Sequence, residues 1–232
     1  MSKMEDLLLS REFPYLQPYF YNNPWAMRCE LGRGRTAEEF EQSARARAEA
    51  ICRILFPRGA DAVIFNSWIY DHAYSGGPGE DNPGASEAFR SRLLEQQLRR
   101  EAELLRFLDA MQRRYRHAVI RDLPTGEEGP DKDCRRSRVF CWRDGGRFDE
   151  PELLERQLRE EPEPLEIGLV SFEYECVLSV YDCRGCDLVF AGPEQFLALY
   201  SRLEPFFLDY DRAELARRYG EALCLKKSDP SV

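Results

Sequence analysis

Residue types that commonly carry chemistry are few in this 232-residue chain, and one cysteine pair has the spacing of metal ligands. Cys183 and Cys186 form a C-x-x-C, a pattern found in redox dithiols and in zinc sites. A redox dithiol needs a helix N-terminus to lower a thiol pKa, whereas this pair falls in a predicted hairpin turn. Zinc needs about four ligands, and the only histidines are His72 and His117. We therefore expect two turn cysteines and no metal or other cofactor, unless distant residues complete a site.

A histidine and a glycine-rich loop follow an apolar run at residues 61–70. His72 comes after Asp71, the arrangement of a general base at a strand end, but no nucleophile motif such as Gly-x-Ser-x-Gly accompanies it. Residues 75–79 lack the patterns of phosphate-binding loops. A solvated loop is the simpler interpretation, and an enzyme site in the 71–84 loop is the alternative.

Four aspartates lie around predicted turns near the C-terminus, and paired carboxylates are potential Mg²⁺ ligands. They are Asp182, Asp187, Asp209 and Asp211. Aspartate also caps turns and helix N-termini, and we favour that interpretation here. An enzyme site near the 182–187 turn remains an alternative.

Two short basic clusters, residues 113–117 and 135–138, contain several arginines each and are candidates for phosphate contacts. The net charge of the chain is −9, however, which argues against nucleic acid and against anionic membrane surfaces. We therefore interpret both clusters as solvated surface. Residues 1–125 hold 18 basic and 18 acidic side chains, and residues 126–232 hold 15 and 24, so the second half carries the whole excess. This imbalance permits a basic partner, and it is explained equally well by a charge that only aids solubility.

The apolar run nearest the N-terminus is only three leucines long, and no run approaches the length that spans a membrane. We therefore expect a cytoplasmic protein without a membrane segment. In a reducing compartment the eight cysteines should be free thiols rather than disulfides.

Apolar periodicity predicts the elements that must position these residues. Met27, Cys29 and Leu31 alternate with charged residues, as in a half-buried strand. Thr36 and Glu39 have capping-box spacing and should begin a helix that ends near Phe56. Further elements are predicted as a buried central strand at 61–70, a helix at 86–116 with an apolar stripe that includes Leu98, Leu104, Leu105 and Leu108, strands near 117–123 and 137–143, and a helix near 150–160.

The strongest strand signal is the alternation over residues 170–181, which indicates one long strand or two strands joined near Glu175. Asp182 to Gly185 should form a hairpin turn, with Gly185 at positive φ. Helices are expected near 193–203 and 211–220. Residues 1–12 are predicted to be an N-terminal helix or arm, and residues 225–232 a C-terminal tail. The whole pattern predicts a single α+β domain over residues 1–232, with a mostly antiparallel sheet of about five or six strands covered by helices.

Several motifs resemble a bacterial family of uncharacterised proteins, domain of unknown function 3885. Nine positions near the C-terminus carry the resemblance: Tyr181, Asp182, Arg184, Gly185, Cys186, Asp187, Asp209, Tyr210 and Asp211. The segments at 28–32 and 54–57 are also similar to the N-terminal part of the family. Many members have aspartate at the position of Cys183, which argues against a C-x-x-C function. The resemblance implies a fold and no particular activity.

Without a catalytic motif, the acidic C-terminal half suggests a small non-enzymatic partner-binding protein, for example an immunity protein that neutralises a toxin. The partner should be basic and should bind the C-terminal half, with Trp142, Tyr200 and Tyr210 as aromatic anchors.

Overall fold

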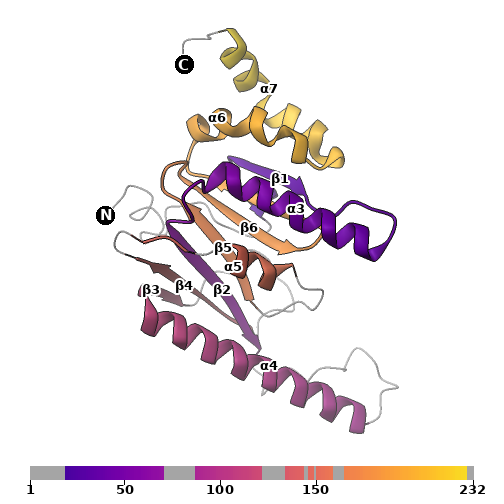
Figure 1. Ribbon diagram of the computed structural model, residues 1–232, viewed down its shortest axis with the longest axis vertical. Helices are drawn as coiled ribbons and strands as arrows, with labels where there is room; N and C mark the ends of the chain where they lie inside the picture. The colour runs from indigo at the N-terminus through magenta and orange to yellow at the C-terminus, as the bar shows by residue number, and fades with distance from the viewer. Residues whose placement is uncertain are drawn as a thin grey trace.

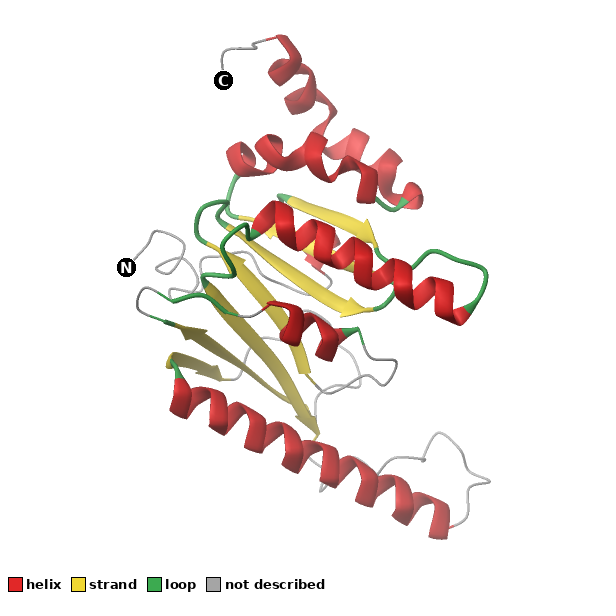
Figure 2. Ribbon diagram, viewed as in Figure 1, coloured by secondary structure: helices red, strands yellow, loops and turns green. Residues whose placement is uncertain are grey.

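The computed structural model describes residues 19–70, 87–121, 134–143, 146–148, 150–158 and 165–228. These residues form one seven-stranded antiparallel sheet with helices packed on it (Figure 1, Figure 2). The α+β class is confirmed, with seven strands instead of five or six. In chain order the elements are α2 (Tyr19–Asn22), β1 (Ala26–Glu30), α3 (Ala37–Leu55), β2 (Ala62–Tyr70), α4 (Glu87–Arg114), β3 (Arg116–Arg121), β4 (Cys134–Trp142), α5 (Glu150–Gln157), β5 (Leu165–Ser171), β6 (Cys176–Asp182), β7 (Gly185–Phe190), α6 (Pro193–Leu203), the 3-10 helices η2 (Glu204–Phe206) and η3 (Asp209–Asp211), and α7 (Arg212–Ser228).

The strand order is β1-β7-β6-β5-β2-β4-β3, and its register sorts the side chains onto two faces. Cys29 lies directly opposite Cys186 on one face, and the register continues this face to Phe65 of β2. Phe65 meets Phe107 of α4 edge to face, and α3 and α5 lie across the same side of the sheet (Figure 1). We call this apolar side the helix face and the other side the polar face.

Local signals account for most of the elements. Thr36 and Glu39 form the predicted capping box at the start of α3. The alternation over residues 170–181 proves to be two strands, because residues 172–175 turn and Glu175 adopts a φ of 44°. β2 lies inside the sheet between β5 and β4, as its run of apolar residues predicted.

Two expectations for the helices are wrong in part. Leu104 and Leu108 of α4 are buried, whereas Leu98 and Leu105 are about half exposed. Successive helix residues differ by about 100°, so Leu105 points away from the side on which Leu104 is buried. In the C-terminal region, α7 continues to Ser228, so residues 225–228 of the predicted tail are helical. No described helix is long and apolar enough to cross a membrane.

Two further predictions, the N-terminal element at 1–12 and the loop at 71–84 with His72, lie outside the described residues.

Candidate functional site

Three charged residues from distant parts of the chain meet on the polar face at the β1 margin of the sheet. Arg28 of β1 lies opposite Asp187 of β7. Its Nε donates to Asp187 Oδ1 at 2.9 Å and its Nη2 to Oδ2 at 3.3 Å, a bidentate pair. Asp211 of η3 approaches from outside the sheet, with Oδ2 3.8 Å from Arg28 Nε. We call these three residues the arginine cluster.

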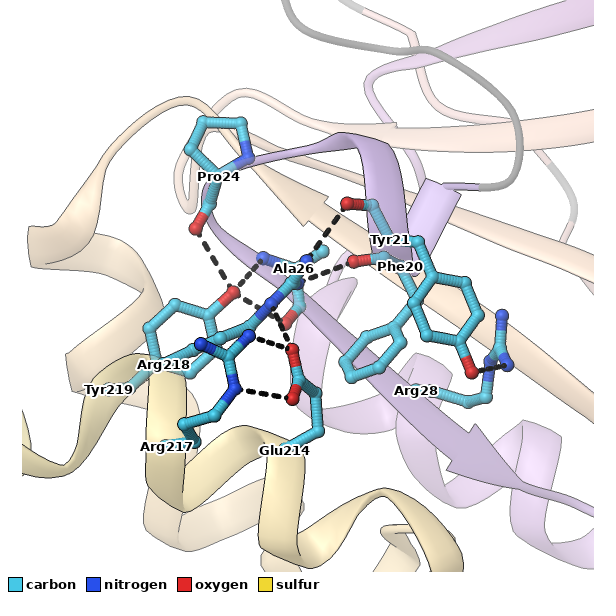
Figure 3. Close-up of polar contacts among 9 residues, drawn as sticks. All are labelled: Phe20, Tyr21, Pro24, Ala26, Arg28, Glu214, Arg217, Arg218 and Tyr219. Carbon is cyan, nitrogen blue, oxygen red and sulfur yellow. Dashed lines mark hydrogen bonds and ion pairs between the residues drawn. The ribbon is translucent and has the colours of Figure 1, made fainter. Parts of the chain in front are cut away.

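The short helix α2 covers the arginine cluster. The rings of Phe20 and Tyr21 in α2 stack on the Arg28 guanidinium, with centroids 5.1 and 4.9 Å from its Cζ. The backbone N–H of Phe20 donates to Asp187 Oδ2 at 3.1 Å. Arg218 of α7 donates to the carbonyl oxygens of Phe20 and Tyr21 at 2.6 and 2.9 Å, which satisfies two otherwise unpaired groups at this short helix (Figure 3). The cluster therefore joins α2, β1, β7 and α7.

Burial and neighbouring charges shift the pKa values of all three residues of the arginine cluster. Burial opposes the charge of Arg28, but hydrogen bonding to Asp187 outweighs it, and the pKa of Arg28 is raised. Burial raises the pKa of Asp187 and of Asp211, with Arg28 opposing both shifts. Asp211 Oδ2 is the one buried side-chain polar atom, among those described, that lacks a hydrogen bond. Of the two carboxylates, Asp187 is thus the firmly paired one.

The hairpin that carries the family motif has the predicted turn, made differently from the prediction. Asp182 accepts the backbone N–H of Arg184 at 2.7 Å and its side-chain Nε at 2.7 Å, as expected for a capping aspartate. Gly185, however, does not adopt a positive φ, which among the described glycines belongs to Gly34 and Gly59 alone. A register shift between Val180 and Asp182 bends the hairpin instead.

Gly185 is needed for space rather than for backbone freedom. A Cβ at this position would lie 2.8 Å from the carbonyl oxygen of Cys29 and would overlap the Tyr181 hydroxyl. The Tyr181 ring therefore lies over a glycine in the neighbouring strand, an arrangement known to protect sheet glycines. Burial raises the pKa of the Tyr181 hydroxyl.

The two motif cysteines do not form a shared site. Cys186 is fully buried on the helix face opposite Cys29, while Cys183 is half-buried in the turn. The hydrogen bond with Cys29 and burial raise the pKa of Cys186, which disfavours the thiolate that a metal or redox partner needs. Among the cysteines whose side chains are described, Cys29, Cys141, Cys176 and Cys186 form no disulfide. Within the described residues no group of three His, Cys, Asp or Glu side chains is placed to hold a metal ion.

The three residues of η3 point in different directions. Asp211 is 1% exposed and belongs to the arginine cluster, whereas Tyr210 is 83% exposed. Asp209 pairs at 2.9 Å with Arg212, which lowers the Asp209 pKa. Leu208, just before η3, donates its N–H to the carbonyl of Arg28 at 3.4 Å. Tyr210 is thus held out on a segment that is fixed on both sides.

Sequence reasoning missed a second polar cluster on the same face. Its Asn66, Glu166 and Arg138 come from neighbouring strands in direct register. Arg138 donates to Asn66 Oδ1 at 2.8 Å, Asn66 to Tyr19 Oη at 2.9 Å, and Tyr19 to Glu166 Oε2 at 2.8 Å. Ser179, which lies opposite Asp187, donates to Glu166. The available signal was the polar residues within the apolar runs at 61–70 and 165–170.

The remaining candidates are dispersed. Arg113 pairs with Asp109 of its own helix, and His117 contacts the carbonyl of Tyr115. Trp142 and Tyr200 are half-buried rather than exposed anchors.

No curated protein and no solved structure matches this chain. The model of a family described as a domain of unknown function, DUF3885, matches residues 6–211, which confirms the resemblance, and the chain belongs to this family.

Proposed function

We propose that this chain is a small non-enzymatic partner-binding protein of the bacterial cytoplasm, and that Tyr210 is the centre of its binding surface. The observation that carries the proposal is the 83% exposure of Tyr210 on a segment anchored by Arg28. Tyr21 and Tyr181, 46% and 41% exposed, flank the arginine cluster and complete what we call the tyrosine surface.

A rigidly presented tyrosine is a good binding anchor for an energetic reason. Tyrosine supplies a large apolar ring and a hydroxyl while losing little side-chain entropy, and such residues dominate protein interfaces. The main chain around Tyr210 is fixed by the hydrogen bond from Leu208 and by the position of Asp211. Little ordering of the backbone is therefore required when a partner binds.

A basic partner fits this surface. The ring of Tyr210 can accept a cation over its face, and the adjacent Asp209 is ionised because Arg212 lowers its pKa. Asp209 is 83% exposed and Arg212 42%, so water screens the attraction between them. A lysine or arginine of the partner can replace Arg212 at low cost. The acidic excess of the chain would speed the encounter.

The 182–187 turn offers less support for catalysis. Asp182 is engaged by Arg184, and Asp187 by Arg28 and the backbone of α2. Neither carboxylate is available as a general base without breaking a structural contact.

Site-specific photo-crosslinking in the native host tests the proposal. A photoreactive phenylalanine analogue at position 210 should capture one basic protein, whereas the same analogue at Leu98, an exposed residue on α4, should not capture it. With that protein purified, Tyr210→Ala should weaken binding by roughly 30-fold, the size of a hot-spot loss. Tyr210→Phe should keep most of the affinity.

Equal capture at positions 98 and 210, or unchanged affinity of Tyr210→Ala, would refute the proposal. Because Tyr210 is exposed, each variant should keep the melting temperature of the parent.

A further inference from the structure

The two margins of the sheet differ in whether other segments contact the outer backbone N–H and C=O groups of the edge strand. At the β1 margin, Phe207 forms an isolated bridge with Cys29, and Leu208 bonds the carbonyl of Arg28. The hydroxyl of Tyr219 accepts the N–H of Ala26 at 3.2 Å (Figure 3). At the other margin, β3 pairs with β4 alone among the strands of the described chain. Within the part of the chain that the structure describes, the β1 margin is thus covered, and the six-residue strand β3 forms the other edge of the sheet.

The exposed side chains along β3 are mostly basic, and one apolar side chain lies among them. Arg116 and His117 are exposed, and Val119 is 39% exposed. Arg113 and Arg114, both exposed, come from the end of α4 immediately before the strand. A local basic margin thus exists in a chain whose net charge is −9.

We propose that β3 binds an extended acidic peptide segment of another protein as an eighth strand of the sheet. Backbone hydrogen bonds supply the affinity in this mode of recognition, and alternate side chains supply the specificity. Glutamate or aspartate side chains on one face of the added strand would lie beside Arg116, and apolar residues on its other face would pack beside Val119.

The charges argue against a second copy of this chain as the occupant. Antiparallel pairing of β3 with itself, in full register, places Arg116 opposite Arg121 at both ends. Like charges directly opposite each other destabilise a strand pair, and basic residues on an edge strand are a known protection against self-association. The same arginines attract an acidic strand.

Nucleic acid fits the edge less well than a peptide. The exposed Val119 and the backbone donors and acceptors of the edge strand match another strand, whereas the backbone phosphates of nucleic acid need only basic side chains.

The test uses the full chain and a fluorescent hexapeptide of alternating glutamate and valine, followed by fluorescence anisotropy. Binding should weaken by about tenfold in Arg116→Glu, since a rim attraction becomes a repulsion. Arg99→Glu is the matched control, because Arg99 is exposed on α4 and its change in charge is identical. This control should bind within about twofold of the parent. Both variants should retain the melting temperature of the parent.

A second pair of probes separates strand pairing from charge attraction. The same hexapeptide with alternate amides N-methylated cannot form the backbone ladder and should lose binding, and a lysine-valine peptide should not bind. Undiminished binding of the methylated peptide, equal effects of the two arginine variants, or preferential binding of a single-stranded oligonucleotide would overturn the proposal. A parent chain that does not bind the glutamate peptide would overturn it as well.

Discussion

Arg28 and Asp187 lie directly opposite each other in β1 and β7, and two hydrogen bonds of 2.9 and 3.3 Å join their side chains. Both residues are largely buried, with side chains 18% and 4% exposed. The pair connects the first described strand to the hairpin that carries the family motif. Loss of this pair should therefore destabilise the fold more than loss of an exposed ion pair.

Asp187→Ala should lower the free energy of unfolding by about 3 kcal/mol, because the buried Arg28 guanidinium loses its bidentate partner and keeps only the more distant Asp211. Asp187→Asn should cost less, since its amide oxygen still accepts from Arg28. Urea unfolding measures both changes. Asp182→Ala is the control in the same hairpin: its partner Arg184 is 76% exposed, so the loss should stay near 1 kcal/mol. Equal losses for Asp182 and Asp187 would contradict the assigned importance of the buried pair.

The contributions of Asp211 and Asp209 to folding stability should change with pH in opposite directions. Burial raises the pKa of Asp211, so its ionisation costs folded-state stability as the pH rises from the unfolded pKa through the folded one. Asp211→Asn should therefore be more stable than the parent at neutral pH, and this gain should disappear on acidification. The hydrogen bond from Arg212 lowers the pKa of Asp209, which contributes stability that is lost as the pH falls.

Asp209→Asn should accordingly be less stable than the parent at neutral pH and equal to it in acid. Urea unfolding of the parent and both variants between about pH 3 and pH 8 gives the comparison. The same sign for the two variants at neutral pH would disprove these assignments.

Gly185→Ala should destabilise the fold by about 1–3 kcal/mol through overpacking, because the new Cβ meets the Cys29 carbonyl and the Tyr181 ring. Gly220→Ala is the matched control, since a Cβ at that helical position meets nothing within 4 Å and alanine favours helix. Thermal unfolding distinguishes them. If Gly185→Ala has the same melting temperature as the parent, the claim that position 185 has no space for a Cβ is wrong.

The cysteines should react with an alkylating reagent at different rates. Of the six cysteines whose side chains are described, Cys183 is half-buried and the other five are buried. Burial raises the pKa of Cys141 to about 12 and that of Cys176 further. Iodoacetamide on the native protein should label Cys183 before the other described cysteines, as read by peptide mass spectrometry. Denatured protein purified without oxygen should yield all eight thiols; fewer would reveal a disulfide.

Short-range patterns in the sequence predicted the elements whose causes are local. The capping box of Thr36 and Glu39 needs only residues three apart, and the turn at Asp182 needs only the next two residues. The alternation of apolar residues likewise identified β1, because a half-buried strand shows its buried face with period two. The alternation over residues 170–181 identified β6 but reached only the last two residues of β5, which is buried on both faces.

Tertiary structure decided everything that depends on which strands become neighbours. The sequence marked Asp187 as part of a motif, but only the register between β1 and β7 gives it Arg28 as a partner 159 positions away. The same holds for Asn66 and Glu166, whose burial is tolerable only because neighbouring strands supply hydrogen bonds. Gly185 was correctly placed in a hairpin and wrongly explained, because its constraint is the Cys29 carbonyl of another strand. Local chain chemistry fixes which segments become strands, whereas pairing between strands distant in the chain depends on the packing of the whole sheet.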